Sequence, residues 1–90
     1  MEELVALAFP NDPIMAKIVK CESNFKHYDK NGKVIISKTN DYGLFQINGI
    51  HLKEAKKRGI DITTPEGNTA FAKILFKQSK YKPWVCRNLI

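Results

Sequence analysis

The hydrophobic positions of the chain repeat at a helical spacing in four stretches. One predicts a short helix over residues 2–9, which a proline ends, and another predicts a basic helix over residues 50–58, which Gly59 ends. Thr64 followed by Pro65 predicts the start of a last long helix. The residues expected on the apolar faces of the first and last helices are Leu4, Leu7, Ala8, Ala70, Phe71, Ile74, Leu75 and Gln78.

The fourth stretch contains the most informative residue of the sequence. Asp12 is expected to cap this helix, and Pro13 to occupy its first position. Glu22 lies eight residues after Ile14 and therefore continues the apolar stripe of the helix, where an acid is unusual. The other members of this stripe are Met15, Ile18 and Val19.

The position of Glu22 predicts a raised carboxyl pKa. Burial penalises the charged form, and the negative end of the helix dipole penalises it again. Both effects favour a proton held near neutral pH, which is the condition for a general acid. The alternative is a frayed helix end, at which Glu22 turns out to water.

The pattern changes after Phe25. Asn31–Gly32 is a turn signal, and the β-branched residues 34–36 that follow predict a small hairpin whose return strand approaches Asp41. Gly43 allows a sharp turn or a close approach of the backbone. Core positions are expected at Leu44, Phe45 and Ile47, and the amides of Gln46 and Asn48 suit either turn and cap bonds or hydrogen bonds to a sugar.

The charge of the chain is strongly basic, with 15 Lys and Arg against 9 Asp and Glu and a net charge of +6. This excess suits a solvated surface or an anionic partner: nucleic acid, an acidic membrane surface or an acidic cell-wall polymer. No nucleic-acid motif accompanies the basic residues. Ninety residues without a linker, a repeat or a low-complexity tract predict one small domain over residues 1–90. Residues 1–10 do not read as a signal peptide, and no run has the length of a transmembrane helix.

Two cysteines, Cys21 and Cys86, lie far apart and lack the spacing of a zinc site. If they pair, the bond closes a loop of about 66 residues, which is worth roughly 4 kcal/mol on the chain-entropy account. Such a bond would indicate an oxidising compartment. The other interpretation is a pair of buried free thiols in a reduced protein.

Two strings within residues 21–48 carry a family resemblance. ESNF begins at Glu22, and DYGLFQIN begins nineteen residues later at Asp41. In this order, after a helix, they resemble the lysozyme-like superfamily, both the animal c-type lysozymes and the soluble lytic transglycosylase domain of bacteria and phages. The resemblance implies an α+β fold, mostly α, with a small β hairpin, and it favours a disulfide between Cys21 and Cys86. The Ala-Tyr-Asn-Ala-Gly string of many transglycosylases is absent.

The resemblance also implies an activity, cleavage of the β-1,4 bond between N-acetylmuramic acid and N-acetylglucosamine in peptidoglycan. Glu22 would be the general acid, and in the c-type pattern Asp41 would be the second carboxylate. The transglycosylases usually lack that second acid, and the N-acetyl or 6-hydroxyl group of the substrate completes the reaction. The match of DYGLFQIN favours an Asp41-assisted muramidase over a lytic transglycosylase. The candidate substrate contacts are Ser23, Tyr42, Gln46 and Asn48.

This interpretation includes expectations about cofactors, oligomeric state and location. The reaction needs no cofactor or metal, and we expect a monomer that acts in a secreted, periplasmic or cell-wall-associated setting, with a phage origin allowed. Membrane insertion and nucleic-acid binding are not expected. Two other functions are weighed against the enzyme: a non-catalytic wall-binding module, and a basic nucleic-acid binder with a steep salt dependence.

Overall fold

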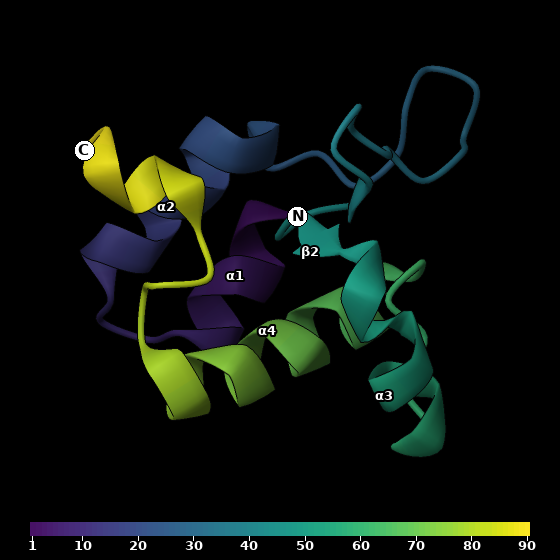
Figure 1. The fold of residues 1–90 in the computed structure, drawn as a ribbon. Helices are drawn as coiled ribbons and strands as arrows, with labels where there is room; N and C mark the ends of the chain where they lie inside the picture. The colour runs from purple at the N-terminus through teal and green to yellow at the C-terminus, as the bar shows by residue number, and fades with distance from the viewer.

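The computed structural model describes all 90 residues. The elements, in chain order, are α1 (Glu2–Ala8), α2 (Pro13–Ser23), β1 (Asp41–Tyr42), β2 (Ile47–Asn48), the 3-10 helix η1 (Gly49–His51), α3 (Leu52–Lys57), α4 (Pro65–Ser79) and the 3-10 helix η2 (Val85–Asn88). The expected α+β, mostly α class is confirmed, with one small antiparallel sheet. α1 packs against both α2 and α4, and the C-terminal segment lies beside α2 (Figure 1).

Two helix starts form as their sequence signals predict. The Asp12 carboxylate accepts a hydrogen bond of 2.9 Å from the Met15 amide at the start of α2. The Thr64 hydroxyl accepts one of 3.0 Å from the Gly67 amide at the start of α4. In each helix a proline takes the first position, where no amide hydrogen is needed.

The core confirms most of the predicted apolar positions and corrects a few. Leu7 is 81% exposed, because α1 buries Val5 and the chain buries Phe9 directly after the helix. Ile14 is 47% exposed, because the buried face of α2 consists of Met15, Ile18 and Val19. Ala70 and Gln78 are also exposed. The buried face of α4 is rotated from the predicted one. It includes two polar residues, Asn68 and Thr69, whose side chains form hydrogen bonds. The other buried residues of α4 are Pro65, Phe71, Ala72 and Leu75.

The β region differs from the predicted hairpin. The Gly32 turn forms, but residues 34–36 contribute only isolated bridges, from Val34 to Tyr28 and from Ile36 to Tyr42. The two-stranded sheet pairs β1 with β2 across the turn at residues 43–46, with Asp41 opposite Asn48. The β-branched residues therefore flank β1 instead of forming a strand of their own. Figure 1 shows the segment before β1 as a loop that extends away from the helices.

The C-terminal segment closes the core. Trp84 is buried, and its indole N–H donates a 2.8 Å hydrogen bond to the Phe45 carbonyl oxygen. The predicted disulfide between Cys21 and Cys86 is present, which joins η2 to the last turn of α2. None of the helices combines the length and the apolar character needed to span a bilayer. The single-domain expectation for residues 1–90 stays a prediction.

Candidate active site

Glu22 lies in the last turn of α2, half-buried. The helix does not fray, since it continues to Ser23 and ends at Asn24, which adopts the left-handed conformation of a C-cap. One carboxylate oxygen of Glu22 accepts a hydrogen bond of 3.2 Å from the backbone amide of Cys86. The acid is therefore held between the end of α2 and η2.

The electrostatic surroundings raise the pKa of Glu22 above its ordinary value. Burial is the main cause, because it penalises the charged carboxylate. The hydrogen bond from the Cys86 amide stabilises the carboxylate and opposes the effect, and the negative charge of Asp41 adds to the increase. The direction agrees with the expectation from the apolar stripe of α2.

Asp41 begins β1 and is enclosed by hydrogen-bond donors. The hydroxyl groups of Ser37 and Thr39 donate to one of its carboxylate oxygens, and the side-chain amide of Asn48 donates to the other at 3.0 Å. Three side chains therefore fix this carboxylate in one orientation. The Ser-x-Thr-x-Asp spacing is a local signal that sequence reasoning missed.

The other candidate contacts are occupied by bonds within the protein. The Ser23 hydroxyl donates to the Leu44 carbonyl oxygen at 2.6 Å and ties the end of α2 to the turn. The side-chain amide of Gln46 donates to the Gly43 carbonyl oxygen, and the carboxamide oxygen of Asn48 caps η1. The half-buried Tyr42 packs against the core. These bonds are the turn and cap chemistry that the sequence left open as one alternative for the two amides.

The turn at residues 43–46 depends on two buried polar side chains that sequence reasoning did not identify. His27 accepts from the Leu44 amide through Nδ1, at 3.0 Å, and bonds the Thr63 carbonyl oxygen through Nε2. Asn68 accepts from the Phe45 amide at 2.7 Å and donates to the carbonyl oxygens of Tyr42 and Ile62. Neither residue has a local sequence signal for this role, because the partners are distant in the chain.

Replacing Gly43 by alanine is expected to destabilise the protein through a steric clash. A Cβ atom at this position would lie 2.3 Å from Cε1 and 2.4 Å from Nδ1 of His27. The matched control is Gly32→Ala, since Gly32 also has a positive φ, +77° against +68°, but has no neighbouring atom within 4 Å. We expect Gly43→Ala to lower the free energy of unfolding by about 1–3 kcal/mol more than Gly32→Ala in urea titrations. Equal losses would contradict the clash.

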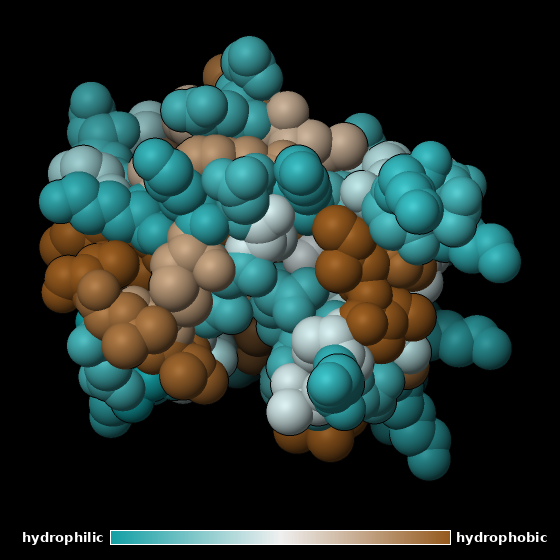
Figure 2. Space-filling model, turned by 90° about the horizontal axis from the view of Figure 1, so that it is seen from above, coloured by the Kyte–Doolittle hydropathy of each residue, from teal (hydrophilic) through white to brown (hydrophobic).

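The surface of the molecule is hollowed, but neither Glu22 nor Asp41 lies in an enclosed pocket. Figure 2 views the molecule from above and shows a face hollowed between two lobes that each carry brown, hydrophobic surface. The pockets of the surface are lined by other residues of the helices and of the segments that flank them. No group of three or more Cys, His, Asp or Glu side chains is placed to hold a metal ion.

The comparison with protein families identifies the chain. Residues 10–83 match the model of the Transglycosylase SLT domain. The chain belongs to this family. The match includes both strings that carry the resemblance and therefore confirms the lysozyme-like superfamily. A comparison with curated proteins and one with solved structures each gave no match.

Membership in the SLT family implies enzymatic cleavage of peptidoglycan of the lytic transglycosylase type. The substrate is therefore the cell wall, which agrees with the peptidoglycan predicted from the sequence. In this SLT domain the match begins before α2 and ends after α4, so it covers Glu22, Asp41 and the turn between β1 and β2.

Proposed function

We propose that this SLT domain cleaves the β-1,4 bond between N-acetylmuramic acid and N-acetylglucosamine, with Glu22 as the general acid. The observation that carries the proposal is the half-buried carboxyl of Glu22, whose pKa is raised chiefly by burial. A raised pKa keeps a carboxyl protonated at higher pH, and only the protonated form can donate a proton to the glycosidic oxygen.

The reaction that best fits the family is a transglycosylation within the substrate. The proton from Glu22 goes to the bridging oxygen, the bond from this oxygen to C1 of the muramic acid breaks, and positive charge develops at C1. The ionised Glu22 then removes the proton from the 6-hydroxyl group of the same sugar, whose oxygen bonds to C1. Glu22 recovers its proton, and the product is a 1,6-anhydro sugar.

Hydrolysis assisted by Asp41 is the second candidate. It is favoured by the Asp41 carboxylate, whose negative charge adds to the raised pKa of Glu22 and which three side-chain donors fix in place. A fixed anion there could stabilise the charge at C1 or attack it, after which water would complete the reaction. The product would then be a reducing sugar, as from a muramidase.

Mass spectrometry of digested peptidoglycan distinguishes the two reactions. We expect 1,6-anhydro fragments, each lighter than the hydrolytic product by one water, and only a mild loss of activity in Asp41→Asn. The matched control is Asp29→Asn, which removes the charge from another turn aspartate that accepts from the Asn31 and Lys33 amides. Reducing fragments, together with a large loss in Asp41→Asn alone, would establish hydrolysis instead.

The substrate contacts, the two other functions and the oligomeric state are also proposals. Substrate contacts are proposed at Ser23, Tyr42, Gln46 and Asn48, in addition to their bonds within the protein. A non-catalytic wall-binding module would retain the wall in the same assay without releasing fragments, and a nucleic-acid binder would show salt-dependent binding to an oligonucleotide. A monomeric state is proposed as well.

A further inference from the structure

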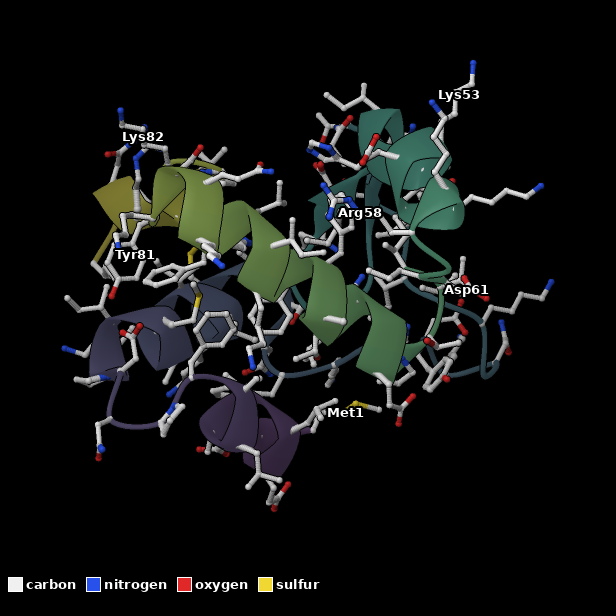
Figure 3. All side chains as sticks on the ribbon, turned by 90° about the horizontal axis from the view of Figure 1, so that it is seen from below. Met1, Lys53, Arg58, Asp61, Tyr81 and Lys82 are labelled. Atoms are coloured by element: carbon white, nitrogen blue, oxygen red, sulfur yellow. A yellow bond between two sulfur atoms is a disulfide. The ribbon has the colours of Figure 1, made fainter.

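The segment after Trp84 contacts Glu22 and has few other bonds to the rest of the protein. Upstream, the Tyr81 hydroxyl lies between α4 and α2 and donates to the Asp12 carboxylate at 2.8 Å (Figure 3). Trp84 is held in the core by its bond to Phe45. Downstream, the Arg87 guanidinium bonds only the carbonyl oxygens of Lys82 and Trp84, within the same segment.

Cys86 is the one buried residue of η2. Val85, at the start of η2, and Leu89, directly after it, are each 73% exposed, so they contribute little packing that would hold η2 in place. The covalent anchor is the disulfide to Cys21, the residue immediately before Glu22. The same residue that forms the disulfide also presents its backbone amide to the Glu22 carboxylate.

We propose that Cys86 is a positioning residue for Glu22, and that the disulfide to Cys21 holds its amide against the acid and so makes cleavage depend on the closed bond. The inference rests on the proposed role of Glu22. The amide restrains the Glu22 side chain, and η2 covers it from solvent. Opening the disulfide releases both restraints together.

The first experiment follows the Cys86 amide by nuclear magnetic resonance in the oxidised protein. We expect its proton shift to titrate with pH together with the Glu22 carboxyl, because the amide donates to that group. The titration should vanish in Glu22→Gln. A Cys86 amide shift that is constant with pH in the oxidised wild type would overturn the proposal, and this measurement does not depend on the folding of any cysteine variant.

The second experiment opens the disulfide. Dithiothreitol supplies two electrons and two protons, so that two thiols form while the reagent becomes a cyclic disulfide. At a temperature where circular dichroism shows a folded protein, we expect kcat to fall about tenfold or more, a factor equivalent to about 1.4 kcal/mol. The double variant Cys21→Ala/Cys86→Ala should show the same loss without reductant. The control Val5→Ala destabilises the core at α1 and should retain kcat.

The pH profile separates positioning from mere stabilisation. Loss of the amide donor would raise the pKa of Glu22, whereas loss of the burial that η2 provides would lower it. The pH at which kcat/KM falls on the alkaline side should therefore differ from that of the wild type, upward or downward according to which effect is larger. In Val5→Ala this pH should be unchanged. A double variant with wild-type kcat and the wild-type value of this pH would refute the positioning role. If instead Glu22→Gln cleaves normally, the proposed function itself fails.

Discussion

Replacing Glu22 by glutamine should lower peptidoglycan cleavage by about 10²- to 10⁴-fold, the usual contribution of a general acid. Glutamine keeps the shape of the side chain and can still accept from the Cys86 amide, but it has no acidic proton to transfer. Release of soluble fragments from purified peptidoglycan measures the effect. Glu66→Gln, which neutralises an exposed acid of α4, is the matched control and should cleave normally.

The same variant should be more stable than the wild type at neutral pH. Because the pKa of Glu22 is raised in the folded protein, the folded state binds the proton more tightly than the unfolded chain does. The stabilisation from this proton is present below the unfolded pKa and is lost as pH rises through the folded pKa. Glutamine carries no charge to bury, so thermal melts at neutral pH should favour Glu22→Gln. A variant that is active and no more stable than the wild type would show that the acid is an ordinary surface residue.

The double substitution Cys21→Ala/Cys86→Ala should cause the largest loss of stability. The disulfide spans 65 residues of sequence. Closing a loop of that length restricts the unfolded chain by about 4 kcal/mol on the chain-entropy account. In a domain of this size such a loss lowers the melting temperature by roughly 15 °C or more. Thermal melts followed by circular dichroism measure the difference.

Reduction provides the internal control for this stability loss. Wild-type protein in excess dithiothreitol should melt at nearly the temperature of the double variant, and the variant itself should not respond to the reagent. Free-thiol titration of the oxidised, denatured protein should find no reactive thiol, since both cysteines are paired. Two thiols in that titration would show that the bond does not form in solution. The same conclusion would follow if the reduced wild type and the double variant melted at the temperature of the oxidised wild type.

Features of the fold that rest on local chemistry could be predicted from the sequence. Asp12 and Thr64 mark the helix starts because each cap bond spans only three residues. Met15, Ile18 and Val19 follow a spacing that the helix itself imposes. The position of Glu22 could be predicted for the same reason, since it continues that spacing into the last turn of α2.

Features that rest on distant partners could not be predicted in this way. His27 supports the turn by bonding residues that lie 17 and 36 positions away. The donor to Glu22 is a backbone amide 64 residues away, and every residue except proline has such an amide. Residues 34–36 have strand-forming side chains, yet the sheet forms between β1 and β2, where Tyr42 pairs with Ile47. Val34 and Ile36 form only isolated bridges. Tertiary contacts decided between these possibilities.

The burial of Trp84 gives the protein an intrinsic optical reporter. It is the single tryptophan of the chain, so all indole fluorescence comes from this one position. Its N–H bonds the Phe45 carbonyl oxygen, and the next residue, Gln46, belongs to the turn of the candidate site. The wavelength and intensity of its emission therefore report the state of that turn, and a bound wall fragment that moves the turn can be followed without any label.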